Sequence, residues 1–202
     1  RFGVASYKRP VGLLIWIHAA SVGEANSVLY FIAQLRKQFP DVNVLVTTGT
    51  VTSATLMATR LPRGVIHQYV PVDTPQATHR FMRHWRPDFA FLVESELWPN
   101  LIDSADRWYC TMGIINGRIS EKSLRMWNKY PSLIKPMLGA FDVVFAQSDH
   151  DAARYERLGA KRVSCPGNLK YDALPLACND AELLALKQII GTRPVWLAAS
   201  TQ

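Results

Sequence analysis

The stretch IWIHAASVGEANS, residues 15–27, joins an apolar strand to a helix, and this junction indicates the fold class. The run from residue 13 to residue 19 is apolar almost throughout, as in strands that are buried on both faces of a sheet. Gly23 permits a tight turn, and Glu24 follows it in the first turn of a helix expected over residues 24–38. A lone carboxylate at this place either suits the helix or takes part in chemistry.

The same succession of short apolar strand and amphipathic helix continues along the chain. Further strands are expected at residues 42–48, 64–72, 88–93, 108–116, 141–147 and 162–165. Helices are expected at residues 51–60, 75–85, 97–105, 120–138 and 149–158, the fourth of them broken near Pro131 and Pro136. This alternation predicts an α/β fold, a Rossmann-like parallel sheet with helices on both faces.

The regular alternation of strands and helices changes near the end of the chain. A linker is expected at residues 174–180, a helix at residues 181–190 and a new strand at residues 193–200. We therefore expect a domain boundary near Pro175. Residues 1–174 would form one domain, and residues 175–202 a linker and the first elements of a truncated second domain. The chain is expected to be part of a longer protein.

The charge of the chain indicates anionic partners. The 202 residues hold 23 Lys and Arg against 16 Asp and Glu, a net charge of +7. Phosphate groups or an anionic membrane surface would suit this balance. The basic residues are spread out except for one cluster, HRFMRHWR at residues 79–86. Without a Lys- and Arg-rich tail, nucleic acid is not an expected partner.

Several other classes of protein are not indicated. The three cysteines, Cys110, Cys165 and Cys178, lie far apart, which is typical of unpaired thiols in a reducing cytosol. No spacing of Cys and His suggests zinc, and no metal site is expected. The GxGxxG and Walker A motifs are absent, which argues against simple NAD or ATP binding. Residues 42–59, the longest run without a charge, are too polar to span a membrane.

The candidate site follows from the predicted sheet, because ligands of open parallel sheets bind beyond the carboxyl ends of the strands. Four unusual loops fall there: ASVGEAN (20–26), TGTVTSA (48–54), ESELWPN (94–100) and NGRIS (116–120). Their shared edge predicts a single site. The histidines within the strands, His18 and His67, are instead expected to be satisfied within the core.

Three carboxylates in these loops are candidates for chemistry. Glu24 has a simpler explanation, since a carboxylate in the first turn stabilises a helix by about 0.3–1 kcal/mol through the macrodipole. Glu94 and Glu96 would point to the same side if the backbone after the strand stays extended. Two carboxylates facing one way are costly unless they are solvated or paired. The alternative for this pair is a hydrated loop.

Two other loops offer groups for an anion. Arg118 follows a strand and Ser120 can cap the next helix, an arrangement that suits a phosphate or a carboxylate. The alternative for the arginine is an ion pair with one of the two neighbouring glutamates. Thr48 and Gly49 begin a loop whose glycine and hydroxyls could form an anion nest. The alternative there is an ordinary threonine-rich turn.

Seven motifs occur in a characteristic order: WIHAASVGEA, TTGTVTSA, YVPVDTP, ESELWPN, NGRIS, GNLKYD and LAAST. In their order and approximate spacing the chain resembles the bacterial 3-deoxy-D-manno-octulosonic acid (Kdo) transferases. The similarity extends from about residue 12 to residue 201. Each motif alone is weak, whereas seven in order are specific.

The resemblance implies a GT-B glycosyltransferase that transfers Kdo from CMP-Kdo to a lipid A precursor, lipid IVA, in lipopolysaccharide synthesis. Residues 1–174 would be the acceptor-binding half, and residues 175–202 would begin the donor-binding half. The chain alone is therefore expected to be inactive. Family members work at the cytoplasmic face of the bacterial inner membrane, and the anchor would lie outside this chain. No cofactor is implied.

The resemblance also assigns expected roles to residues of this chain. Glu24 matches the proposed general base, and Glu94 or Glu96 a second required carboxylate. Ser21, Gly23, Thr48, Gly49, Arg118 and Ser120 are expected on the acceptor or phosphate side, and Asn168, Lys170 and Ser200 on the donor side or at the interdomain crossing. Two alternatives stay open: another GT-B enzyme with a different nucleotide sugar, and a non-catalytic nucleotide- or lipid-binding module.

Overall fold

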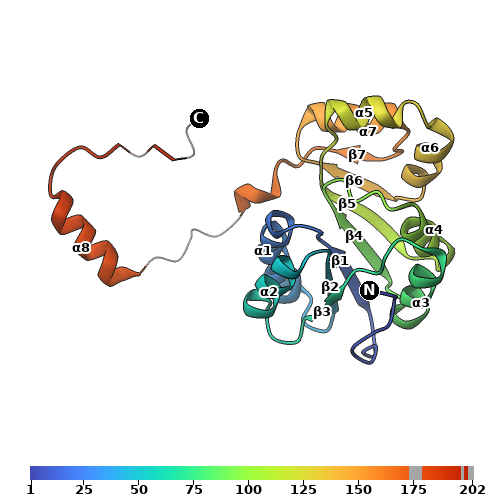
Figure 1. Ribbon diagram of the computed structural model, residues 1–202, viewed down its shortest axis with the longest axis horizontal. Helices are drawn as coiled ribbons and strands as arrows, with labels where there is room; N and C mark the ends of the chain where they lie inside the picture. The colour runs from blue at the N-terminus through green and yellow to red at the C-terminus, as the bar shows by residue number, and fades with distance from the viewer. Residues whose placement is uncertain (173–178, 197, 200–202) are drawn as a thin grey trace.

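The computed structural model describes residues 1–172, 179–196 and 198–199 (Figure 1). In this part of the chain seven parallel strands form one sheet in the order β3-β2-β1-β4-β5-β6-β7. The strands are β1 (Leu14–His18), β2 (Asn43–Thr48), β3 (Ile66–Tyr69), β4 (Phe89–Val93), β5 (Thr111–Gly117), β6 (Val143–Ala146) and β7 (Val163–Ser164). The predicted Rossmann-like fold class is confirmed.

Helices connect the strands, as the alternation predicts. They are α1 (Val22–Gln38), α2 (Val51–Arg60), α3 (Pro75–Trp85), α4 (Pro99–Arg107), α5 (Glu121–Trp127), α6 (Pro131–Gly139) and α7 (Asp149–Leu158), followed by the 3-10 helix η1 (Leu169–Asp172) and by α8 (Asp180–Ile190). The stretch expected at residues 120–138 is two helices. Pro131 begins the second of them, whereas Pro136 lies inside it without ending it.

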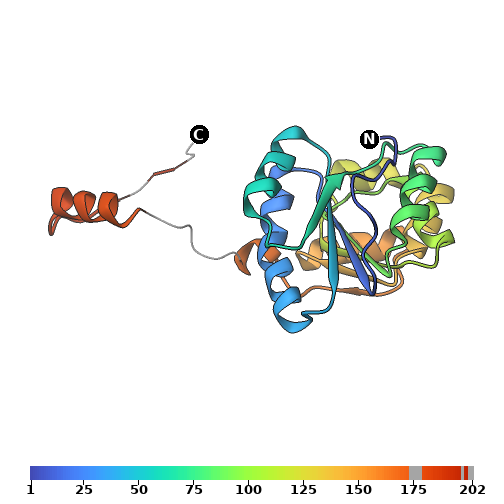
Figure 2. The ribbon, with the colours of Figure 1, turned by 90° about the horizontal axis from the view of Figure 1, so that it is seen from below.

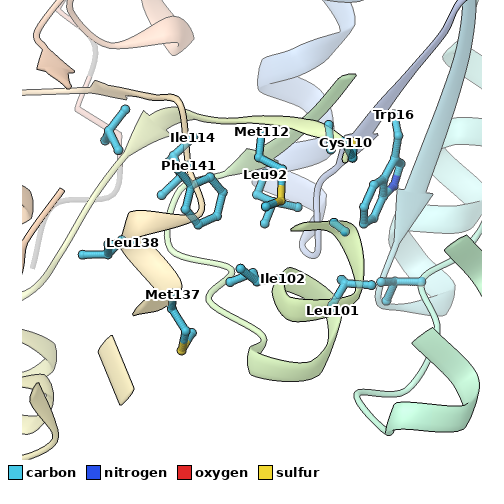
Figure 3. Packing of buried hydrophobic residues seen from close by; sticks show 14 of the residues in the cluster. Trp16, Leu92, Leu101, Ile102, Cys110, Met112, Ile114, Met137, Leu138 and Phe141 are labelled. Atoms are coloured by element: carbon cyan, nitrogen blue, oxygen red, sulfur yellow. The ribbon is translucent and has the colours of Figure 1, made fainter. Parts of the chain in front are cut away.

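Each face of the sheet carries a hydrophobic core. Along β1, Leu14 and Trp16 belong to one buried cluster, and Ile15 and Ile17 to the other. The first cluster contains residues of α3, α4, α5, α6 and α7 and is shown in part in Figure 3, while α1 and α2 cover the other face (Figure 2). A strand that faces two cores is apolar at nearly every position, which explains the apolar run at residues 14–17.

The end of the chain behaves differently. None of the residues of α8 is buried, and this helix lies apart from the sheet in Figures 1 and 2. The described residues of the stretch 193–200 form no strand, contrary to the prediction. A strand needs a neighbouring strand for its hydrogen bonds, and none of the described strands pairs with this stretch. Pro175 and Ser200 lie outside the described residues, so the domain boundary stays a prediction.

Gly117, the last residue of β5, leaves room for a buried tyrosine. A Cβ at this position would lie 2.9 Å from Cε2 of Tyr155, whose side chain is fully buried. The Tyr155 hydroxyl in turn donates a hydrogen bond of 2.8 Å to the backbone oxygen of Glu94. Gly117→Ala is therefore expected to lower the free energy of unfolding by about 1–3 kcal/mol through overpacking, as measured by urea denaturation.

The matched control is Gly139→Ala in α6. A Cβ at Gly139 would meet only Nζ of Lys161, at 4.0 Å. Alanine is favoured over glycine within helices by about 0.5–1 kcal/mol, so this change should be neutral or stabilising. An equal loss of stability in both variants would contradict the steric explanation.

Candidate active site at the carboxyl edge of the sheet

The β1–α1 and β2–α2 loops are bonded to each other at the carboxyl edge of the sheet. The Gly49 N–H donates to the Ala20 oxygen at 3.2 Å, and the Ser53 hydroxyl donates to the same oxygen at 3.3 Å. A side chain at Gly49 would press on this contact, since its Cβ would lie 3.2 Å from the Ala20 oxygen. The loop that precedes Glu24 is thus held by the neighbouring loop.

Glu24 is buried, with an exposed fraction of 8%, and both of its carboxylate oxygens accept hydrogen bonds. Oε2 accepts from the Ala20 N–H at 2.8 Å, and Oε1 accepts from the Ser21 hydroxyl at 2.7 Å. The Ser21 oxygen is the N-cap of α1 and accepts from the Glu24 N–H at 3.2 Å. Glu24 thus lies in the first turn of α1, as the simpler explanation requires. The same contacts also fix the carboxylate in space.

The protonation of Glu24 is shifted by its surroundings. Burial raises the pKa of this carboxyl above its ordinary value of 4.5. The hydrogen bonds from Ser21 and Ala20 lower the pKa by less than burial raises it, and the negative charges of Glu96 and Glu94 raise it further. A carboxylate whose pKa is raised is a stronger base at neutral pH. Three carboxylates thus interact at one edge of the sheet.

Glu96 has a partner that the sequence does not suggest. Its Oε2 accepts from the Trp98 indole N–H at 2.6 Å and lies 3.6 Å from Nε2 of His18. Burial raises the pKa of Glu96, but the His18 ring and the Trp98 N–H lower it by more, so that the net shift is downward. His18 is fully buried, as expected, but its Nε2 has no hydrogen-bond partner among the described residues. The expectation of a satisfied core histidine is therefore met at Nδ1 of His18, which contacts Thr47, but not at Nε2.

Glu94 departs from the extended backbone that would align it with Glu96. Its φ is +58°, in the left-handed region. Its Oε1 accepts from Nζ of Lys170 at 3.0 Å, across 76 residues of sequence. Asn168 supports this pair, because its side-chain oxygen accepts from the Lys170 N–H at 3.0 Å and its amide donates to Gln147 at 3.2 Å. Lys170 and the segment after β7 thus join the same edge.

The loop that carries Arg118 is held from α7. The Ile119 N–H donates to Asp151 at 2.9 Å, and Arg154 donates to the Ile119 oxygen at 2.6 Å. Ser120 caps α5, as predicted, by accepting from the Ser123 N–H at 3.1 Å. Arg118 is exposed and forms no ion pair within the described residues, so the alternative of an ion pair with a neighbouring glutamate is wrong.

Thr48, another predicted site residue, contacts a histidine of the neighbouring strand. The Thr48 side chain is buried and lies 3.0 Å from Nε2 of His67, a histidine whose pKa is lowered by burial. His67 is therefore hydrogen-bonded, as expected. Ser21 and Gly23 are exposed at the start of α1. A phosphate contact by Ser21, Gly23, Thr48 or Gly49 stays a prediction.

Two further properties concern the described residues as a whole. They contain no group of three or more His, Cys, Asp or Glu side chains placed to hold a metal ion. Among them, no helix has both the length and the apolar character that crossing a membrane requires.

Solved structures with a similar fold belong to other enzymes. The complex of MnaA from S. aureus with UDP matches with a TM-score of 0.60 at 12% identity, over 86% of this chain and 52% of that one. The UDP-GlcNAc 2-epimerase of Neisseria meningitidis matches with a TM-score of 0.55 at 14% identity, over 89% of this chain and 51% of that one. At such low identity these matches support the fold alone.

Sequence comparison identifies the family. Residues 1–173 match the family described as 3-Deoxy-D-manno-octulosonic-acid transferase (kdotransferase). The 3-deoxy-D-manno-octulosonic acid transferase of Rickettsia bellii is 36% identical over 100% of this chain and 48% of that protein. The transferase of Rickettsia felis is 38% identical over 98% of this chain and 42% of that protein. The transferase of Haemophilus influenzae is 34% identical over 99% of this chain and 47% of that protein. The chain thus spans about half the length of these relatives, and it belongs to the family of 3-deoxy-D-manno-octulosonic-acid transferases.

Proposed function

We propose that the protein containing this chain transfers Kdo from CMP-Kdo to a lipid A precursor, lipid IVA, with Glu24 as the general base. One observation carries this proposal beyond family membership. The Glu24 carboxylate is buried, held on both oxygens and raised in pKa, at the sheet edge where ligands of such folds bind. This arrangement suits a base that must be positioned and must accept a proton near neutral pH.

The chemistry needs a base because a sugar hydroxyl is a poor nucleophile. The hydroxyl oxygen of the acceptor forms a bond to the anomeric carbon of Kdo while the bond from that carbon to the CMP phosphate breaks. The hydroxyl proton passes to Glu24, whose oxygens keep lone pairs beyond those used by Ala20 and Ser21. CMP departs as an anion, so that no protein acid comparable to that of a glycosidase is required.

Two cationic side chains at the same edge would bind the phosphate groups of the substrates. Arg118 is exposed at the end of β5, and Lys170 lies beside Glu94. An arginine is suited to phosphate because its planar guanidinium binds two oxygens at once. We therefore assign Arg118 to a phosphate of the acceptor and Lys170 to the donor side.

A second basic region suits an anionic membrane surface. Arg80, Arg83 and Arg86 of the HRFMRHWR cluster are exposed on α3 and just after it. Beside them, the Arg80 side chain donates to the Phe2 oxygen at 3.0 Å, and the Phe2 side chain is itself exposed by 71%. Arginines beside exposed apolar side chains are typical of surfaces that lie on anionic lipid. This surface would face the cytoplasmic leaflet of the inner membrane.

Glu24→Gln tests the role of the base. The change keeps the size of the side chain and an oxygen to accept a hydrogen bond, but it removes the ability to accept a proton. Turnover of the full-length enzyme, measured as Kdo transfer to lipid IVA, is expected to fall by about 10²–10⁴-fold. The loss of stability should stay within about 1 kcal/mol, the contribution of a carboxylate at a helix start.

Glu94→Gln and Glu96→Gln are the matched comparisons, because each removes one neighbouring carboxylate. A folded Glu24→Gln enzyme that keeps more than about a tenth of the wild-type turnover is incompatible with a base of this strength. Glu24 would then be only a carboxylate in the first turn of α1. Transfer from a UDP-sugar but not from CMP-Kdo would favour the alternative GT-B enzyme, and substrate binding without turnover would favour a non-catalytic module.

The pH dependence of turnover provides an independent test. Because burial raises the pKa of Glu24 above 4.5 in the free protein, the acidic limb of the kcat/KM profile is expected above that value. The value of kcat/KM should fall as the pH falls through the raised pKa, where the base becomes protonated. The sign for stability is opposite: since the folded state holds the proton more tightly, wild type should lose stability relative to Glu24→Gln as the pH rises from the unfolded pKa through the folded pKa. An acidic limb below 4.5 contradicts the assignment.

Arg83→Glu tests the membrane surface. Each basic residue near an anionic bilayer contributes about 1 kcal/mol, and reversing one charge replaces this attraction by a repulsion of similar size. Binding of the 202-residue chain to anionic vesicles should therefore weaken by about 30-fold. Wild-type binding should also weaken as salt rises. Arg157→Glu, which makes the same change on the exposed surface of α7, is the control. Equal binding of wild type to neutral and anionic vesicles, measured by sedimentation at low salt, contradicts the proposal.

A further inference from the structure

His18 is a buried histidine with one nitrogen unaccounted for. Its side chain is inaccessible to solvent, and Nε2 forms no hydrogen bond within the described part of the chain. Buried polar atoms without a partner are uncommon, because losing water without a replacement costs free energy. The carboxylate oxygen Oε2 of Glu96 lies 3.6 Å from this nitrogen, within the range of an ion pair but longer than a hydrogen bond.

The other side of the imidazole ring is fixed by the neighbouring strand. His18 of β1 is paired with Thr47 of β2 in the parallel register. Nδ1 lies 3.1 Å from the Thr47 backbone oxygen and 3.0 Å from its hydroxyl oxygen. The hydroxyl oxygen also accepts from the Trp16 indole N–H at 2.9 Å. These contacts orient the ring, so that Nε2 is directed to the carboxyl edge of the sheet.

The chemistry of the two groups indicates where the hydrogen lies. In the neutral form with the hydrogen on Nδ1, Nε2 would present a lone pair to the lone pairs of the Glu96 carboxylate. In the neutral form with the hydrogen on Nε2, and in the imidazolium, Nε2–H points at the carboxylate and the contact is attractive. Thr47 accommodates both of these forms, since its hydroxyl can donate to Nδ1 and its backbone oxygen can accept from Nδ1–H.

We infer that His18 is a positioning residue, whose Nε2–H holds the Glu96 carboxylate ionised and in place beside Glu24. The inference rests on the proposed function for its catalytic consequence only. Trp98 holds the same oxygen from the solvent side at 2.6 Å, so that Glu96 lies between a buried and an exposed donor. An ionised Glu96 raises the pKa of Glu24 through charge repulsion. His18 would thereby act on the base through Glu96.

The charged groups around Glu96 come from several elements. His18 belongs to β1 and Glu24 to α1, while Glu94, at the end of β4, is paired with Lys170 of η1. Of these groups, His18 lowers the pKa of Glu96, while Glu96 and Glu94 raise the pKa of Glu24. A test must therefore observe Glu96 directly rather than infer its state from turnover alone.

The experiment uses the full-length protein labelled with ¹³C at the glutamate carboxyls. The Glu96 signal is assigned from its loss in Glu96→Gln, and its pH titration is followed in wild type, His18→Gln and His18→Leu. His18→Leu, which has no donor, should raise the titration midpoint of Glu96. His18→Gln should raise it less, because its amide N–H can replace Nε2–H. An unchanged Glu96 titration in folded His18→Leu overturns the inference.

Should His18→Leu not fold, His18→Phe provides the second variant. It keeps a planar ring at this position but has no N–H to donate, so the Glu96 midpoint should again rise. A midpoint that stays at the wild-type value in folded His18→Phe overturns the inference in the same way.

Kinetics then test the catalytic consequence. In Kdo transfer to lipid IVA, His18→Leu should lower kcat by about 10-fold or more with little change in KM, as for a lost hydrogen bond to a charged group. In the Glu96→Gln background the same change should have almost no further effect, since both act through one carboxylate. Additive losses overturn the link through Glu96. Failure of the wild-type enzyme to transfer Kdo would overturn the proposed function, while the titration would still decide the role of His18.

Discussion

The peptide groups of Ala20 hold the candidate site together. The Ala20 oxygen accepts from the Gly49 N–H and from the Ser53 hydroxyl, while its N–H donates to Glu24. One residue thus ties the end of β1 to the loop after β2 and to the first turn of α1. The strand order sets β1 between β2 and β4, so that the loop carrying Glu94 and Glu96 follows the next strand of the same edge.

A place at the helix start and base chemistry are compatible explanations of Glu24. Its carboxylate accepts from the Ala20 N–H, which precedes the N-cap, and from the hydroxyl of the N-cap residue Ser21, and these contacts remove its freedom to rotate. Burial under the same turn disfavours the charge and raises the pKa. A carboxylate held at a buried helix start is therefore positioned and made basic by the same packing.

The fold and the approach of three candidate carboxylates to one another were predictable because both follow from local patterns. Apolar runs predicted the strands, and the rule that strand ends share an edge predicted that Glu24, Glu94 and Glu96 would meet. The side-chain partners were not predictable. Lys170 reaches Glu94 from 76 residues away, and His18 faces Glu96 only because of strand order and register, which no local pattern encodes. The strand expected at residues 193–200 is not formed by the described residues of that stretch, for a related reason, since strand formation depends on a neighbouring strand.

The left-handed backbone of Glu94 has a consequence for protein engineering. With φ at +58°, a residue that carries a side chain costs about 1–2 kcal/mol more than glycine would at the same place. A directed-evolution screen that rewards heat resistance alone would therefore favour glycine at position 94 and discard the carboxylate paired with Lys170. Selection for thermostability at this position would oppose retention of this ion pair. Libraries designed to stabilise the protein should accordingly hold position 94 constant.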